Sequence, residues 1–404
     1  MPTPDVVILG AARTPIGRYG GSFKDVHPAE LGAVAARAAI ERAGVTAADV
    51  DEVLIGHGRQ GGSGPNPGRQ VGHRAGVPHT TPAQTINKAC ASGLQAIASG
   101  AQSIMLGESE IVLAGGIESM SRMPYLIDAA DARWGHRMGN FPLVDAMFRD
   151  GFQCPLSQLI MGETAEILAQ EYGITREQSD CFALESQRKA KAAIDAGYFS
   201  REIAPVTVPS EGRGAAPATV IDRDEHPRDT TLDSLRRLAP VFGEVDGRSG
   251  IITAGSSSGV TDGGAALVLA SSETARARGL TPRAKILGWA SAGVDPRIMG
   301  IGPVPAIEKL RQRIGLGIGD FDLVELNEAF APQVLAVLRE VPVGADRLNV
   351  NGGAIALGHP IGATGARIVV TLLHELERRR ARRGLATLCV SGGMGMALAI
   401  ERIW

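Results

Sequence analysis

The chain has 404 residues, a formal net charge of −2 and 44% hydrophobic residues. Lys+Arg 41 against Asp+Glu 43 gives no overall attraction to nucleic acid or to an anionic membrane, so neither is an expected partner. The length allows two or three domains, and 52 glycines with only 4% aromatic residues favour cores of small aliphatic side chains.

The first third of the chain alternates apolar β-branched runs with helical periodicity. Strands that alternate with helices imply parallel pairing through right-handed crossovers. The predicted elements are a strand over 6–9, a helix over 28–43, a strand over 51–55, a helix that follows Cys90 and ends at Gly107, and a strand over 110–114.

The chain between residues 121 and 248 breaks this pattern and predicts an inserted loop subdomain. Cys181, Leu184 and Ala192 occupy apolar positions of one predicted helix, so Cys181 is expected in the core. A strand-like run over 265–269 then returns to the first sheet. The elements expected within the insertion are helices over 164–172 and 176–196 and an exposed turn over 210–214.

Four segments of the first third recur in the same order in the last third. The alternative is chance similarity between Gly/Ala-rich segments, but the conserved order favours a duplicated α/β unit. The runs at Ile8, Val53, Cys90 and Val112 are repeated at Ile286, Val324, His359 and Leu388. The expected domains are an N-terminal half (1–120 and 249–271), the inserted loop domain (121–248) and a C-terminal half (272–404).

A cysteine, Cys90, stands among small residues at the predicted start of a helix, in the segment Asn87–Gly93. Unpaired backbone N–H groups and the helix dipole favour an anion there, which predicts a lowered thiol pKa and a nucleophilic thiolate. The alternative is that Cys90 is a small buried hydrophobic residue, as many free cysteines are.

If the two halves are pseudo-symmetric, three further residues are expected to lie near Cys90. His359 then approaches Cys90 from the matching helix start, and Pro360 keeps it in the loop, where its imidazole can take the thiol proton. Cys389 and Asn327 leave the C-terminal ends of second-half strands, where ligands bind in α/β folds. A buried inert thiol is the default interpretation of Cys389, whereas two thiols at one site indicate a nucleophile and an acid/base.

The sequence does not support a disulfide scaffold, a metal site, a membrane-spanning segment or a serine hydrolase. Four widely spaced cysteines are not a disulfide scaffold and predict a reduced, cytoplasmic protein. There is no C-x-x-C or H-E-x-x-H, so no metal is expected, and no apolar run reaches membrane length. The run Gly255–Gly259 matches G-x-S-x-G, but turn residues follow it instead of a helix, which argues against a serine hydrolase.

Four motifs together resemble the thiolase family (acetyl-CoA acetyltransferases and 3-ketoacyl-CoA thiolases) over essentially the whole chain. They are Asn87–Gly93, Asn327–Phe330, Asn351–Gly365 and Cys389–Gly395. The resemblance implies an α/β fold with two pseudo-symmetric mixed sheets, helices in α-β-α-β-α layers and an inserted loop subdomain. It also implies an acyltransferase that condenses two acetyl-CoA to acetoacetyl-CoA or thiolyses 3-ketoacyl-CoA, with CoA thioesters as substrates and no separate cofactor.

The resemblance also implies residue roles. Cys90 would be the acylated nucleophile, His359 its activator and Cys389 the acid/base for the α-proton. His359 and a water held by Asn327 would stabilise the enolate, and the backbone N–H groups of Cys90 and Ser391 would stabilise the tetrahedral intermediate. The implied assembly is a homodimer, or a homotetramer in which two dimers pair through 121–140. Positions that match the CoA pocket are Arg228, Ser234, Phe242, Ala254, Ser258, Met299, Ala329 and Phe330.

Two departures from the family pattern leave the acyl chain length open. Ile160 stands where short-chain members carry a histidine, and the Asn-Ala-Ser-Gly-x-Asn-Asp pattern appears here as Ser256–Asp262. One alternative is a broad or longer-chain degradative 3-ketoacyl-CoA thiolase. A decarboxylating ketosynthase is another, although it would carry a histidine in place of Asn327 and lack Cys389. The third is a non-catalytic acyl-CoA- or lipid-binding protein.

Overall fold

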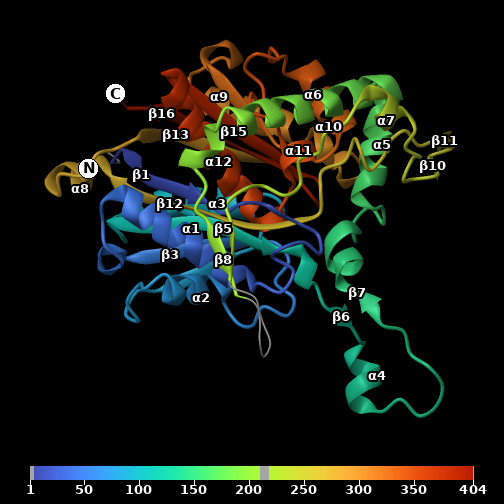
Figure 1. Ribbon diagram of the computed structural model, residues 1–404, viewed down its shortest axis with the longest axis horizontal. Coiled ribbons are helices and arrows are strands. Elements are labelled where there is room, and N and C mark those ends of the chain that lie inside the picture. Colours follow the sequence, from blue (N-terminus) through green and yellow to red (C-terminus); the bar gives the residue numbers. More distant parts are fainter. Residues whose placement is uncertain (1–3, 210–217, 404) are drawn as a thin grey trace.

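The two halves of the chain build sheets with the same pairing pattern (Figure 1). In the first half, β3 pairs in parallel with β4 and β5, and β12 lies between β5 and β1 and pairs with both in the antiparallel sense. In the second half, β14 pairs in parallel with β15, and β16 lies between β15 and β13 and pairs with both in the antiparallel sense. The predicted duplication is therefore confirmed. The strands are β1 (Val6–Arg13), β3 (Glu52–His57), β4 (Ala83–Ile86), β5 (Ile111–Ser119), β12 (Thr261–Ser271), β13 (Ala284–Gly293), β14 (Leu323–Leu326), β15 (Arg383–Val390) and β16 (Met394–Arg402).

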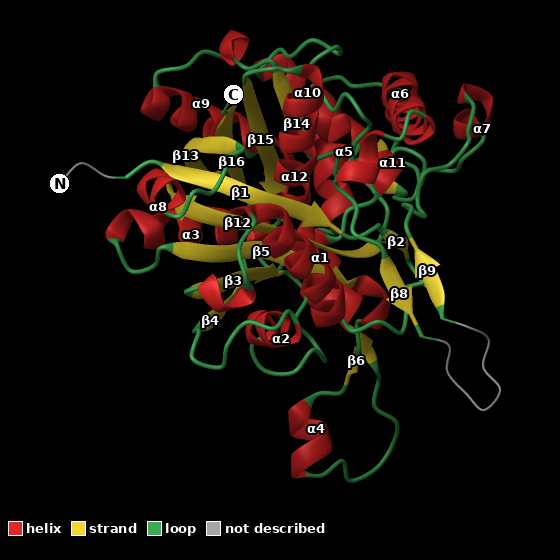
Figure 2. Cartoon of the chain, turned by 60° about the vertical axis from the view of Figure 1, so that its left-hand side comes forward, coloured by secondary structure: helices red, strands yellow, loops and turns green. Residues whose placement is uncertain are grey.

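The sheets of the two halves meet at their edge strands (Figure 2). The computed structural model describes residues 4–209 and 218–403, so the turn predicted over 210–214 lies outside the described residues. β1 and β13 pair at Val7–Lys285 and Ile8–Ala284, which joins the two expected sheets into one continuous path. Both edge strands shift register at the same place, between Ile8 and Gly10 and between Ile286 and Gly288. A shared bulge at equivalent positions is a further mark of duplication.

Helices separate and cover the sheets in five layers, which confirms the predicted architecture. The middle layer consists of α3 and α12, whose residues share one buried cluster with strands of both halves, for example Ile97, Val369, Val112 and Leu398. Separate clusters pack α1 and α2 on the outer face of the first sheet, and α9 and α10 on that of the second. The helices are α1 (Pro28–Ala43), α2 (Pro67–Arg74), α3 (Ser92–Leu106), α8 (Ser272–Ala277), α9 (Pro303–Ile314), α10 (Ala331–Glu340), α11 (Ala354–Leu357) and α12 (Ile361–Arg379).

The N-terminal ends of α3 and α12 cross with almost no side chain between them. A Cβ atom on Gly93 would lie 2.8 Å from the backbone nitrogen of Ala366, and one on Gly365 would lie 2.4 Å from the backbone nitrogen of Leu94. Only glycine permits this approach of the two backbones. The crossing brings together the loops that precede the two helices, and these loops carry Cys90 and His359.

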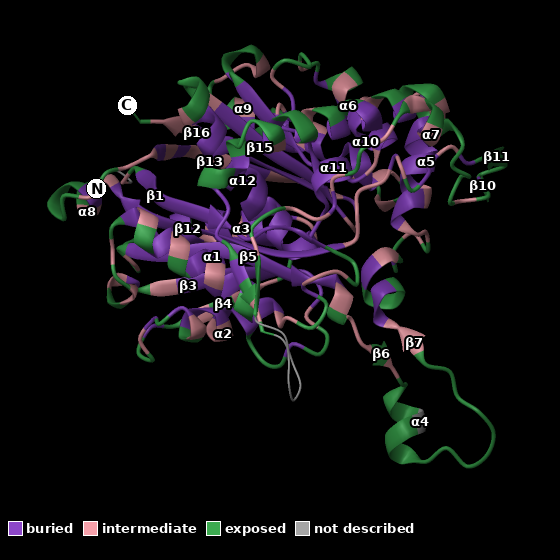
Figure 3. Cartoon of the chain, in the orientation of Figure 1, coloured by how far each residue is buried: buried purple, intermediate pink, exposed green. Residues whose placement is uncertain are grey.

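The inserted segment forms a protrusion and then a helical cover over one end of the sheets (Figure 1). The tip of the protrusion is exposed at residues 127–130 and 132–143, as the green α4 region of Figure 3 shows. The elements of the segment are β6 (Tyr125–Leu126), α4 (Ala129–Trp134), β7 (Val144–Asp145), a π-helical turn (Phe148–Phe152), α5 (Met161–Glu171), α6 (Arg176–Asp195), β8 (Val206–Val208), β9 (Thr219–Ile221), α7 (Leu232–Arg236), β10 (Glu244–Val245) and β11 (Arg248–Ser249).

The predicted orientation of α6 is wrong. Cys181 and Ala192 are exposed, and of the three residues expected in the core only Leu184 is buried. The reason is that α6 buries polar side chains that have specific partners. The Ser186 hydroxyl donates to Glu328 Oε2 at 2.7 Å, and Asp180 accepts from Arg176 at 2.8 Å.

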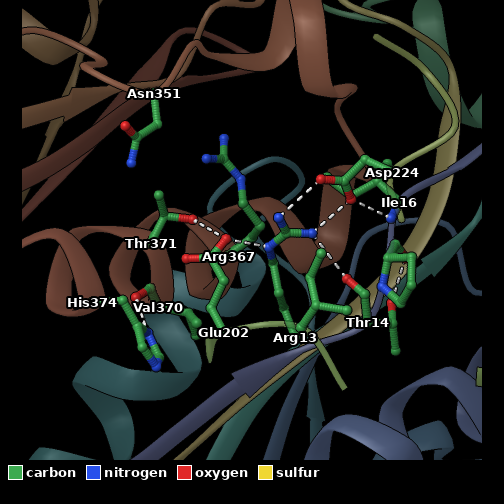
Figure 4. A network of polar contacts seen from close by, with 12 residues as sticks. Arg13, Thr14, Ile16, Glu202, Asp224, Asn351, Arg367, Val370, Thr371 and His374 are labelled. Atoms are coloured by element: carbon green, nitrogen blue, oxygen red, sulfur yellow. Dashed lines mark hydrogen bonds and ion pairs between the residues drawn. The ribbon is translucent and has the colours of Figure 1, made fainter. Parts of the chain in front are cut away.

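A buried ionic network fastens the inserted segment to both halves (Figure 4). Arg13 of β1 donates to Glu202 Oε1 at 2.6 Å and to both carboxylate oxygens of Asp224 at 2.7 and 2.9 Å. Thr371 of α12 donates to the same Glu202 oxygen at 3.2 Å. Removal of one partner from such a buried pair costs about 3–5 kcal/mol, so this network fixes the segment that covers the sheet ends.

Candidate active site

Cys90 lies in a constrained loop, two residues before α3 begins at Ser92. The preceding residue, Ala89, has a φ of 45°, a left-handed conformation that is strained for a residue with a side chain. Asn87 Oδ1 accepts the Ala89 N–H at 2.9 Å. The Ser92 hydroxyl accepts the Lys88 N–H at 2.8 Å and donates to Ala89 O at 2.6 Å. These bonds hold the thiol in one orientation.

The prediction that the helix start lowers the Cys90 pKa is wrong. Burial raises the pKa of the Cys90 thiol above its ordinary value, although Arg59 and the backbone N–H groups of Ser391 and Cys90 itself act in the opposite direction. The thiol is therefore protonated at neutral pH, and its attack on a carbonyl needs a base. The two N–H groups beside the sulfur are the pair that the sequence suggested for an oxyanion hole.

His359 stands two residues before α12, at the place that Cys90 has before α3. Its Nδ1 lies 2.7 Å from Thr364 Oγ1, and that hydroxyl donates to Pro360 O at 2.9 Å. Because the hydroxyl proton is already used, we assign the imidazole proton to Nδ1, which leaves Nε2 as a free acceptor.

The His359 imidazole is neutral. Burial, together with the charges of Arg367 and Arg59, lowers the pKa of His359 to about 3. Nε2 has no hydrogen-bond partner within the described part of the chain. A neutral imidazole with an open Nε2 can accept a proton from a neighbouring thiol.

Cys90, His359 and Cys389 line one chamber of about 60 Å³. Cys389 is the penultimate residue of β15 and is almost fully buried. Burial and the nearby Cys90 raise the pKa of the Cys389 thiol well above its ordinary value. The other lining residues are Arg59, Phe152, Met161, Ser258, Met299, Ala329, Phe330, Ile361 and Ser391.

Asn327 does not line this chamber. It follows β14, is 1% exposed, and its backbone N–H donates to Thr387 O at 3.0 Å. Neither polar atom of its side chain has a hydrogen-bond partner among the described residues. Buried amides of this kind are commonly satisfied by an ordered water.

A second, more open cavity of about 280 Å³ adjoins the chamber and shares part of its wall. Ile160 lines it and presents an apolar side chain. Two residues predicted for the CoA pocket, Arg228 and Ser234, line neither cavity. Of the other six, the outer cavity is lined by Phe242, Ala254, Ser258 and Phe330, and the chamber by Ser258, Met299, Ala329 and Phe330.

Sequence reasoning missed several chamber residues. Arg59 stands two residues beyond β3, at the sheet edge where ligands bind, and a charged residue at such a strand end is a signal that could have been used. Phe152 comes from the inserted segment, where no periodicity or motif marks it, and Met161 directly follows Ile160, at which the sequence departs from the family pattern. Ile361 is the first residue of α12, and nothing in the sequence distinguished it from the other residues of that helix.

The described residues contain no group of three or more His, Cys, Asp or Glu side chains that could hold a metal ion. Among those same residues, no helix combines the length and the apolar character needed to cross a membrane.

Comparisons with known proteins agree with this geometry. Family models described as "Thiolase, N-terminal domain" and "Thiolase, C-terminal domain" match residues 6–273 and 280–402. The chain is 51% identical over 399 residues to the acetyl-CoA acetyltransferase of Cupriavidus necator, which covers 98% of this chain and 99% of the relative.

Two solved structures are similar over nearly their whole length. The Bacillus anthracis acetyl-CoA acetyltransferase superposes with a TM-score of 0.94 at 46% identity, covering 99% of both chains. The human mitochondrial 3-ketoacyl-CoA thiolase in complex with CoA superposes with a TM-score of 0.93 at 43% identity, covering 100% of this chain and 99% of the other. On the strength of the two matching domains and these full-length likenesses, the chain belongs to the thiolase family.

Proposed function

We propose that this chain catalyses reversible acyl transfer between CoA thioesters through an acyl-enzyme on Cys90. The observation that carries the proposal is the single chamber lined by Cys90, His359 and Cys389, with two backbone N–H groups at the Cys90 sulfur. In the forward direction two acetyl-CoA give acetoacetyl-CoA, and in the reverse direction CoA cleaves a 3-ketoacyl-CoA. CoA thioesters are the substrates, and no separate cofactor takes part.

The first half-reaction is acylation. Cys90 Sγ attacks the thioester carbon while His359 Nε2 takes the thiol proton, and the departing CoA thiolate then receives that proton. The N–H groups of Cys90 and Ser391 stabilise the charge on the tetrahedral oxygen, a contribution of about 3–4 kcal/mol per donor in comparable sites.

The second half-reaction makes or breaks the carbon–carbon bond. Cys389 first gives its thiol proton to His359 Nε2 and, as the thiolate, removes the α-proton of a second acetyl-CoA. The enolate oxygen is stabilised by His359 and by a water on Asn327. The enolate carbon attacks the acyl carbon, and the Cys90 sulfur leaves as a thiolate that takes the proton held by His359. Thiolysis follows the same steps in reverse.

The chain-length preference can be tested by thiolysis of acetoacetyl-CoA and of a series of longer 3-ketoacyl-CoA substrates. The chamber of about 60 Å³ favours the acetyl group, so kcat/KM is expected to be highest for acetoacetyl-CoA. The alternative of a longer-chain degradative thiolase is supported by Ile160 and by the apolar outer cavity of about 280 Å³. A kcat/KM that rises with chain length would favour the longer-chain degradative thiolase. Binding of these substrates without turnover would favour the non-catalytic acyl-CoA- or lipid-binding protein.

We further propose that the chain assembles as a homodimer or homotetramer and that the protruding region over 121–140 forms one contact. Trp134 and Met138 on it are 83% and 90% exposed, and apolar side chains of this size on a projecting loop mark a protein interface. The double substitution Trp134→Glu with Met138→Glu is expected to lower the mass measured by light scattering. Leu106→Glu, at an apolar residue 74% exposed on the end of α3, is the matched control. An unchanged mass in the double variant would remove the protrusion from the interface.

We also propose a cytoplasmic location. All four cysteines are free thiols, and Cys181 is exposed without a partner. Such thiols persist in a reducing compartment.

A further inference from the structure

Glu118 is a buried carboxylate that the proposed reaction does not use, and it joins elements of both halves. It is the penultimate residue of β5 and is 0% exposed. Its Oε2 accepts the backbone N–H of Gly362, the second residue of α12, at 2.9 Å. Its Oε1 accepts the backbone N–H of Arg59, in the loop after β3, at 3.3 Å. One side chain of the first half therefore binds the first turn of a helix of the second half.

Both of these N–H groups belong to segments that form the chamber wall. Arg59 itself lines the chamber, and so do His359 and Ile361, which precede Gly362 by three residues and by one residue. A carboxylate is favoured at this place, because the first N–H groups of a helix have no partner within the helix and the helix dipole attracts an anion. Glu118 therefore ties the loop that carries Arg59 to the segment that carries the imidazole.

The backbone around the Glu118 carboxylate is closely packed. A Cβ atom on Gly362 would lie 2.5 Å from the backbone nitrogen of Gly58 and 2.5 Å from the carbonyl oxygen of Ile117. A Cβ atom on Gly58 would lie 2.9 Å from Glu118 Oε2 itself. On the other side, Nε2 of the fully buried His57 lies 3.0 Å from Glu118 Oε1. The start of α12 thus has one position relative to β3 and β5, and Glu118 supplies the hydrogen bonds that hold it there.

The charge of Glu118 does not by itself explain why the residue lies here. Burial is the main cause of the raised Cys90 pKa, and the negative charge of Glu118 raises that pKa further. This charge therefore opposes formation of the thiolate nucleophile. A benefit to the reaction has to come from the hydrogen bonds that Glu118 accepts.

We propose that Glu118 is a positioning residue for acyl transfer, which holds the start of α12, and with it the His359 imidazole, where proton transfer from Cys90 requires it. A proton acceptor must lie within hydrogen-bond reach of its donor, and a displacement of about 1 Å can cost about 100-fold in rate. Thr364 fixes the orientation of the His359 ring, whereas Glu118 fixes the backbone that carries the ring. The inference rests on the proposed acyl-transfer function.

The test is Glu118→Gln, which keeps the shape of the side chain but leaves only one oxygen to accept the two N–H groups. The rate of Cys90 acetylation by acetyl-CoA, followed by intact mass, and kcat for thiolysis are both expected to fall by about 10- to 100-fold. KM for acetoacetyl-CoA should change little, because Glu118 lines neither cavity. Glu118→Asp keeps the charge on a shorter side chain and is expected to lose rate as well, so it decides the matter if the Gln variant does not fold.

A second measurement separates positioning from an effect of charge. Iodoacetamide alkylates the Cys90 thiolate and needs no base held by the protein. Removal of the Glu118 charge lowers the Cys90 pKa, so the pH midpoint of alkylation should move to lower pH in Glu118→Gln, as measured by mass in a Cys181→Ser background. A thiol that loses its proton more easily and yet is acetylated more slowly indicates a displaced base.

Glu166→Gln is the matched control. Glu166 is 1% exposed, accepts the backbone N–H groups of Ile251 and Ile252 at 2.9 and 2.7 Å, and lines neither cavity. This variant is expected to be acetylated at the wild-type rate. The inference is overturned if Glu118→Gln is acetylated at the wild-type rate or faster, or if Glu166→Gln loses as much activity. A wild-type protein that acetyl-CoA does not acetylate would instead contradict the proposed acyl transfer, so the two failures are distinguishable.

Discussion

Replacing Cys90 with alanine is expected to abolish acyl-enzyme formation and to lower kcat for thiolysis by about 10⁶-fold, the loss seen when a covalent nucleophile is removed from a comparable catalytic group. No other thiol can take over the attack. Cys389 lines the same chamber, but burial raises its pKa well above the ordinary value, and it has a separate role in the proposed reaction. The measurement is the intact mass of the protein after mixing with acetyl-CoA.

The matched control for this prediction is Cys181→Ser. Cys181 is a free thiol on the exposed face of α6, and it lines neither cavity of the site. The control is expected to acquire one acetyl group and to turn over at the wild-type rate. An acetyl adduct of wild-type yield on the Cys90→Ala protein would refute the assignment of the nucleophile.

The sequence predicted the duplication because the repeated elements are fixed by backbone geometry. Gly93 and Gly365 are required where α3 and α12 touch, and Cys90 and His359 then occupy the same place before their helices. Where closely packed backbone requires a particular residue, both copies carry that residue and it can be recognised in the sequence. This is why the pairing of a thiol with an imidazole could be inferred from the order of the segments.

Features set by the three-dimensional environment could not be inferred in this way. The pKa of Cys90 is raised because residues from distant parts of the chain bury the thiol, and no local pattern records that burial. The orientation of α6 was misjudged because its buried face carries polar residues, among them Ser186, whose partner Glu328 is distant in sequence. Arg59 and Phe152 reach the chamber from two loops that share no motif.

Replacing Cys389 with alanine is expected to separate the two half-reactions. Acetylation of Cys90 should stay within a few-fold of the wild-type rate, because Cys90, His359 and both backbone donors remain. Exchange of the acetyl-CoA α-protons with D₂O should fall by about 10³- to 10⁴-fold, the upper range for loss of a general acid/base. The two measurements are the mass of the protein and the deuterium content of recovered acetyl-CoA. Retained exchange would remove Cys389 as the base.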